Sequence, residues 1–169
     1  MVIAAIAVSL VLLVGGSFAV SGIITSGHNL NAMADLDKVS TAEVSQAAAN
    51  DSFIGYRQTG TAAGDQALED SGVGFHPTAG GKLSVVLSPA PNAAGGPAVA
   101  GQTVWGYAAI AQSAAVGGPK FIRTSASQLT ADVDASGAAW KLTGSNAAKV
   151  TADLAKLGIT VAQLKTALG

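Results

Sequence analysis

The chain has 169 residues, of which 49% are hydrophobic and 11% are charged, and its formal net charge is −1. The charged fraction is less than half of the ~25% of ordinary soluble domains, and this apolar, near-neutral composition excludes both a disordered chain and a strongly basic nucleic-acid binder. The length fits one small domain beside an apolar segment, and the absence of Cys excludes disulfides, thiolate metal sites and cysteine nucleophiles.

The first 25 residues are almost unbroken in their apolar and small side chains, and no Asp, Glu, Lys or Arg precedes Asp35. Twenty-five helical residues span ~37 Å, which is enough to cross the ~30 Å hydrocarbon core of a bilayer. A cleavable signal peptide would instead begin with a basic stretch and carry a shorter apolar core. Residues 1–25 therefore predict a transmembrane helix or a helix buried in a bundle. Because no basic cluster follows them, we expect the rest of the chain to lie outside the cytoplasm.

Glycines interrupt this apolar segment at Gly15, Gly16 and Gly22. Each costs ~1 kcal/mol of helix propensity relative to alanine, so we expect the helix to be locally soft there. Small residues also allow close approach of neighbouring helices, and glycine is common in transmembrane helices in general.

The pattern becomes amphipathic over residues 26–54, which predicts that the helix continues through 1–54. We expect one apolar stripe, facing a small domain. Its expected members are Leu30, Met33, Leu36, Val39, Val44 and Ala47 or Ala48. The polar residues expected to fall outside the stripe are Asn29, Asp35, Asp37, Glu43 and Gln46.

Residues 55–169 predict a globular domain. Strand-forming residues cluster in 82–88, 102–111 and 120–125, and a fourth strand is expected within 128–142. Short, directly connected strands favour an antiparallel meander, because parallel pairing needs long crossovers. The fold class is therefore α+β.

The end of the chain returns to helix. Ser145 or Asn146 is the expected N-cap of a helix that Gly158 stops, and Thr160 with Gln163 has the spacing of a capping box for a second short helix.

Few residues carry a signal for chemistry. His28 and His76 are far apart and lack metal-ligand spacing, and the two D-x-D pairs, at 35/37 and 132/134, do not continue into a calcium-binding loop. We expect solvated carboxylates at these pairs. Lys120 and Arg123 flank Phe121, and we interpret them as charges on an exposed strand face rather than as a nucleic-acid site. The sequence predicts no catalytic residue, no cofactor and no metal.

The order of elements resembles that of a type IV pilin, with an apolar and then amphipathic N-terminal helix, an antiparallel sheet and a variable C-terminal region. The resemblance is closest over the apolar start at 1–14 and over 34–56 (ADLDKVSTAEVSQAAANDSFIGY). The chain departs from the family at Ala5, where most members have glutamate, and it lacks both the common proline near position 22 and the disulfide-closed C-terminal loop. Gly22, with Gly15 and Gly16, is the expected replacement for the softening role of that proline.

The resemblance implies a structural subunit of an extracellular filament, held in the cytoplasmic membrane before assembly. It implies homo-polymeric packing of N-terminal helices, a prepilin peptidase and a pilus assembly machinery as partners, and N-methylation of Met1. Adhesion, motility and DNA uptake are the roles that such filaments have. The residues expected in the filament core are Met1, Val2, Ile3, Ile6, Leu10, Leu13 and Val14.

The alternative hypothesis is a single-pass membrane-anchored extracytoplasmic binding module that works as a monomer. An archaeal-type filament protein shares the apolar helix but usually carries a β-sandwich, and the long amphipathic stretch after His28 argues against it.

Overall fold

A computed structural model describes residues 2–58, 66–88, 106–115 and 117–169, with side chains from Gly22 onward. Helix α1, Val2–Asn50, runs without a break through the three glycine positions. It ends four residues before the expected boundary at 54, because Asp51 adopts a left-handed φ of 56°. Across the residues whose side chains are described, none of the helices is both long and apolar enough for a membrane crossing. Residues 1–21 lie outside that description, so the transmembrane expectation for 1–25 stays a prediction.

Six strands form one antiparallel sheet in the order β1-β2-β3-β4-β5-β6, which confirms the meander. The strands are β1 Tyr56–Arg57, β2 Lys82–Leu87, β3 Tyr107–Gln112, β4 Lys120–Thr124, β5 Thr130–Asp134 and β6 Lys141–Thr143. The strand expected at 102–111 is present from Tyr107 on, whereas 102–105 lie outside the described residues.

The region expected to form a fourth strand, 128–142, contains most of two. Asp134 ends β5, and its Oδ1 accepts a hydrogen bond of 3.0 Å from the backbone N–H of Ser136, which opens the turn that leads to β6. Strand β1 and the single-turn helix α2, Ala67–Asp70, were not predicted, because two to four residues are too few to show a period.

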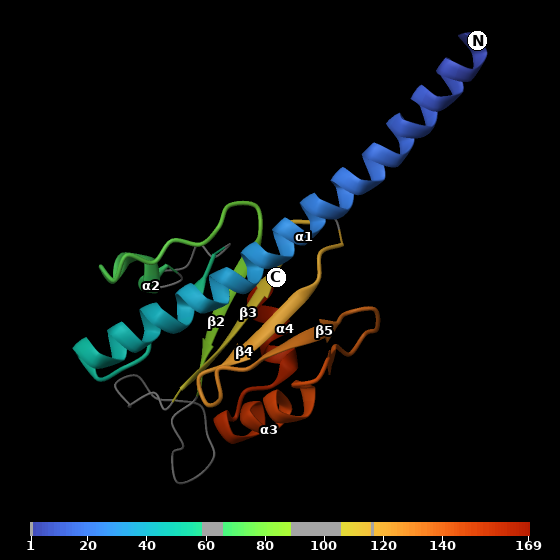
Figure 1. Ribbon diagram of the computed structural model, residues 1–169. Coiled ribbons are helices and arrows are strands. Elements are labelled where there is room, and N and C mark those ends of the chain that lie inside the picture. The colour runs from blue at the N-terminus through green and yellow to red at the C-terminus, as the bar shows by residue number, and fades with distance from the viewer. Residues whose placement is uncertain (1, 59–65, 89–105, 116) are drawn as a thin grey trace.

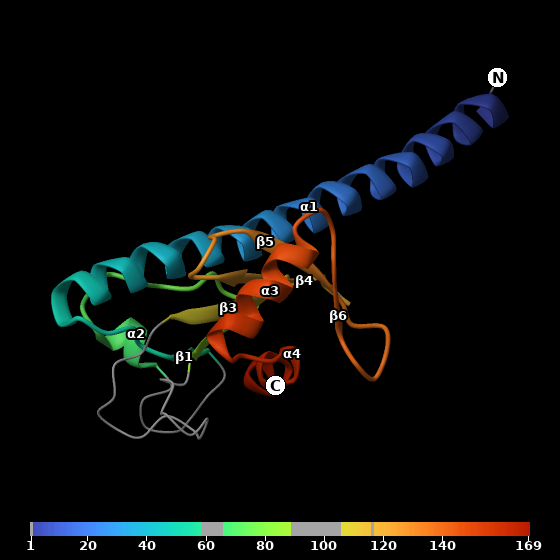
Figure 2. The same ribbon diagram turned by 90° about the horizontal axis from the view of Figure 1, so that it is seen from below.

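Helices cover both faces of the sheet. The second half of α1 lies along one face, and α3, Ala147–Leu157, and α4, Val161–Leu168, lie against the other (Figure 2). The central strand β3 is apolar at successive positions because both of its faces are buried. Tyr107 and Ala109 belong to the core on the α1 side, whereas Ala108 and Ile110 belong to the core on the α3 and α4 side.

The C-terminal helices begin and end close to the residues that the sequence predicted. Gly158 adopts φ 66° and its N–H donates to backbone carbonyls of α3, while Thr160 and Gln163 form a complete capping box at α4. Asn146 stands at the N-cap position of α3, but its side chain makes no cap hydrogen bond and donates to the Thr130 carbonyl of β5 at 2.9 Å instead. This asparagine therefore joins α3 to the sheet.

Candidate functional site: the two faces of helix α1

The inward face of α1, which packs on the sheet, carries polar as well as apolar residues. Its members are Ala32, Asp35, Leu36, Val39, Ala42, Glu43 and Gln46, all of them buried. Their spacing of three and four residues is that of one helical face. The expectation that Asp35, Glu43 and Gln46 lie outside the buried stripe was wrong, because each falls on the same face as Leu36 and Val39.

Asp35 is buried because the domain supplies donors to it. Its carboxylate accepts from the backbone N–H of Thr78 at 3.0 and 3.1 Å and from Thr78 Oγ1 at 2.8 Å. Lys38 Nζ, one turn along the helix, donates to Asp35 Oδ1 at 2.8 Å and also reaches Thr78 Oγ1 at 3.1 Å. A buried carboxylate is tolerated when it is paired and hydrogen-bonded, as here. The pair fixes the segment before β2 to α1.

Glu43 is the most deeply buried acidic side chain of the described residues, at 0% exposure. Its Oε2 accepts from the backbone N–H of Ile54 at 3.0 Å, and its Oε1 has no partner. Burial raises the pKa of this carboxyl to about 7, and the hydrogen bond from Ile54 only partly offsets the cost of desolvation. Glu43 therefore keeps its proton to a higher pH than an exposed glutamate does.

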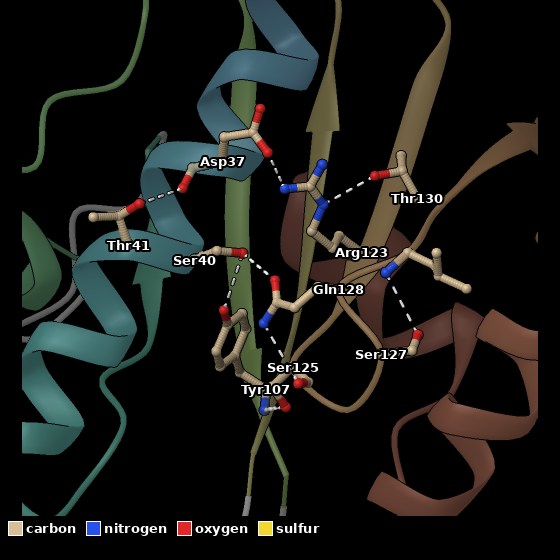
Figure 3. A network of polar contacts seen from close by, with 10 residues as sticks. Asp37, Ser40, Thr41, Tyr107, Arg123, Ser125, Ser127, Gln128 and Thr130 are labelled. Carbon is tan, nitrogen blue, oxygen red and sulfur yellow. Dashed lines mark hydrogen bonds and ion pairs between the residues drawn. The ribbon is translucent and has the colours of Figure 1, made fainter.

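A second polar network joins the middle of α1 to β3, β4 and the turn after β4 (Figure 3). Arg123 forms an ion pair with Asp37 and donates to Thr130 Oγ1 at 2.9 Å. Ser40 donates to Gln128 Oε1 at 2.6 Å and accepts from the Tyr107 hydroxyl at 3.3 Å. These contacts fix the rotation of α1 about its own axis, and so determine which of its residues face outward.

The opposite side of α1 is apolar and uncovered. The exposed large hydrophobic residues in the described part of the chain all lie on α1: Ile23 at 72%, Ile24 at 54%, Leu30 at 66% and Val44 at 59%. The expectation that Leu30 and Val44 belong to the stripe facing the domain was wrong. Leu30 is six residues from Leu36, and Val44 is five from Val39, and neither spacing keeps two side chains on one helical face.

Three of the four exposed hydrophobics, Ile23, Leu30 and Val44, belong to a regular pattern that we call the outward stripe, whereas Ile24 lies off it. Its members are Ile23, Gly27, Leu30, Ala34, Asp37, Thr41, Val44 and Ala48. Successive members are alternately four and three residues apart, which averages 3.5 and keeps them on one line of the helix. Large residues alternate with small ones, and the one charged member, Asp37, is paired with Arg123. At about 100° per residue, this stripe lies roughly opposite the inward face.

The pattern could have been found from the sequence by testing a second heptad register after the inward residues had been assigned. The single apolar stripe predicted from the sequence combined residues of both faces, namely Leu36 and Val39 of the inward face with Leu30 and Val44 of the outward stripe.

The N-terminal half of α1 extends beyond the sheet and the other helices (Figure 1). Most of the expected filament-core residues lie on this projecting arm, namely Val2, Ile3, Ile6, Leu10, Leu13 and Val14, and their side chains are outside the described set. Met1, expected to be N-methylated, is also outside the described residues. Gly15, Gly16 and Gly22 lie within the continuous helix, and a Cβ added at Gly22 would meet no atom within 4 Å.

The residues considered for chemistry are dispersed. His28 lines a small pocket between α1 and the segment before β2, and His76 Nδ1 lies 3.5 Å from Glu69 Oε1. No group of three or more His, Asp or Glu side chains within the described ranges is placed to hold a metal ion. At the second D-x-D pair, Asp132 and Asp134 are both exposed as expected, on strand β5 beside β6.

The expected exposed strand face at β4 was wrong. Phe121 is buried against α1, and Arg123 is on the same side, paired with Asp37. Lys120 lies on the opposite face, beside the ring of Trp140. The two cations therefore cannot act as one surface.

Comparison with known proteins identified no matching family model, no matching curated protein and no matching solved structure.

Proposed function

We propose that this protein is a structural subunit, a pilin, of an extracellular type IV pilus-like filament that assembles by packing of its N-terminal helices. The observation that carries the proposal is the outward stripe of α1. It offers large apolar residues separated by small ones, on the side of the helix that the protein's own domain leaves uncovered. The long helix on an antiparallel sheet is compatible with a pilin fold without being specific to it.

The energetics favour mutual packing of such helices. Removing an exposed Leu, Ile or Val side chain from water contributes about 1.5–3 kcal/mol, and the stripe repeats this along the helix. Small residues between the large ones allow two helix backbones to approach closely. Contacts between different surfaces of successive copies propagate as a helical filament when the rotation between copies does not close into a ring. Before assembly the apolar arm would be held in the cytoplasmic membrane, and a prepilin peptidase and a pilus assembly machinery would act on the chain.

The proposal is tested by placing a charge on the outward stripe. Leu30→Lys and Val44→Lys should each abolish filaments, because the ammonium group would be buried between helices without a partner. Both side chains are exposed in the single subunit, so its folding should be unchanged. Electron microscopy of material sheared from the cell surface provides the measurement.

Ala49→Lys is the matched control. Ala49 is exposed on the same helix but lies outside the stripe, and lysine is well tolerated near a helix C-terminus. Filaments should persist in this variant. Unchanged filaments in both stripe variants would contradict the proposal.

The alternative is a membrane-anchored binding module that works as a monomer. In this alternative the same apolar arm anchors the chain in the membrane. The part of the outward stripe from Leu30 to Ala48, on the half of α1 that packs on the sheet, then has no role. An anchored monomer would therefore show normal surface display and a constant monomeric mass in both stripe variants and in the unchanged protein.

A further inference from the structure

A groove of about 480 Å³ opens on the face of the sheet that carries α3 and α4, away from α1. It lies between the end of β3, the start of β4, the turn before β6 and helix α4. The lining residues that matter here are Gln112, Lys120, Trp140, Lys165, Thr166 and Leu168. Its volume is in the range of small-ligand sites, about 300–1,000 Å³, and is sufficient for one or two sugar rings.

Two ammonium groups converge on one aromatic ring in this groove. Lys120 Nζ is 5.3 Å from the centroid of the Trp140 ring, and Lys165 Nζ is 5.4 Å from it. Lys165 also donates to the Ala138 carbonyl at 3.1 Å. Within the described part of the chain, neither lysine forms an ion pair with a carboxylate. The groove therefore brings together two ammonium groups that have no ion-pair partner among the described residues.

The apolar and neutral polar parts of the lining are also suited to a particular ligand. Trp140 is half-buried and Leu168 is buried, so both are held in place by the core beneath them. Gln112 and Thr166 add a side-chain amide and a hydroxyl, which can exchange hydrogen bonds with hydroxyl groups.

We propose that this groove binds a carboxylated sugar, such as a uronic-acid unit of an acidic polysaccharide. The sugar carboxylate would draw the ammonium groups of Lys120 and Lys165 off the Trp140 ring and pair with them. The apolar face of the pyranose would then lie against Trp140, and the ring hydroxyls would contact Gln112 and Thr166. A nucleic acid fits less well, because strand binding needs a continuous basic track along the backbone, whereas here the charge is confined to one groove.

The site does not depend on filament formation. It lies on the face of the sheet opposite α1, so packing through the outward stripe would leave it open, and binding can be measured on the unassembled chain.

The test is isothermal titration calorimetry of the full chain in a non-ionic detergent at low salt, with digalacturonate as the probe. We expect saturable binding, weakened about 10-fold by Lys120→Gln and by Lys165→Gln, which corresponds to about 1.4 kcal/mol for each lost charge pair. Trp140→Leu should abolish the binding. Lys149→Gln, which removes an exposed lysine on α3 outside the groove, should leave it unchanged.

Neutral galactobiose and a 12-nucleotide oligothymidylate are the comparison probes. Binding of galactobiose as tight as that of digalacturonate would overturn the role of the lysines, and tighter binding of the oligothymidylate would overturn the sugar assignment. Absence of digalacturonate binding to the unchanged protein would overturn the proposal as a whole. Lys120→Gln and Lys165→Gln each replace only the ammonium end of a side chain, so we expect both variants to fold. They therefore test the proposal even if Trp140→Leu fails to fold.

Discussion

At the scale of single residues, the interface between α1 and the sheet contains more charge than an apolar helix face normally does. Asp35 is compensated by donors from Lys38 and Thr78, whereas Glu43 receives one backbone hydrogen bond and is otherwise desolvated. The two carboxylates should therefore respond differently to substitution.

Glu43 should make the protein less stable as the pH rises. Its pKa is about 7 in the folded protein and near 4.5 in the unfolded chain, so the folded state binds the extra proton between these values. The free energy of unfolding should fall from about pH 4.5 to about pH 7 and then level off, by roughly 3 kcal/mol at most. Glu43→Gln should remove this fall, because an amide does not titrate. Urea unfolding at a series of pH values measures the slope.

Asp70→Asn is the control for this experiment, since Asp70 is an exposed carboxylate and its removal should leave the slope in place. A Glu43→Gln protein with the same pH dependence as the unchanged protein would contradict the assignment of the slope to Glu43. The slope, rather than the absolute stability, is the readout, because a glutamine at this site changes the packing at every pH.

Asp35→Ala should destabilise the fold by about 1–3 kcal/mol, because it leaves the N–H and hydroxyl of the half-buried Thr78 without their acceptor. The midpoint of urea unfolding measures this loss. Asp70→Ala, at an exposed aspartate outside this clamp, is the matched control and should leave the midpoint where it is. Equal losses of stability at the two positions would contradict the conclusion that Asp35 holds the segment before β2 against α1.

At the scale of elements, the sequence predicted structure where a local signal was long or chemically specific. Gly158 and the pair Thr160 and Gln163 placed the C-terminal helices because a left-handed cap and a capping box need particular residue types at fixed spacing. The two-residue β1 left no period to detect. The separation of β5 from β6 depends on an exposed turn rather than on a strong break in hydropathy.

Thr160→Ala should destabilise α4 by about 1 kcal/mol, because it removes the acceptor for the Gln163 N–H and half of the capping box. Thermal unfolding followed by circular dichroism is the measurement. Thr151→Ala removes an exposed threonine from the interior of α3 and should be neutral or slightly stabilising, because alanine is the better helix former there. A loss at Thr151 equal to that at Thr160 would count against the cap as the cause.

At the scale of the whole molecule, the layout of α1, sheet and C-terminal helices was predicted only in outline. The α+β class and the antiparallel meander follow from patterns along the chain, but the choice of face does not. Leu30 and Leu36 look alike in the sequence, and the docking of Asp35, Asp37 and Ser40, together with the apolar core, turns Leu30 outward. Side-chain partners distant in the sequence therefore determine the candidate site.

The pilin proposal also makes a prediction for the projecting arm. Leu13→Lys should abolish surface filaments, because a charge would enter the bundle of apolar helices without a partner. The N-terminal residue of sheared filaments should be a methylated Met1, which mass spectrometry can identify. Intact filaments in the Leu13 variant, or an N-terminus other than Met1, would contradict the proposal.

Helix α1 has two sets of neighbours under this proposal: its inward face packs on the sheet of its own subunit, and its outward stripe packs on the helices of other subunits. Among homologous sequences, changes at Val39 or Glu43 should be accompanied by changes elsewhere in the same chain, at positions that touch them. Changes at Leu30 or Val44 should covary with surface positions that have no contact with them inside one subunit. Pairs of the second kind would trace the lattice of the filament from sequence variation alone.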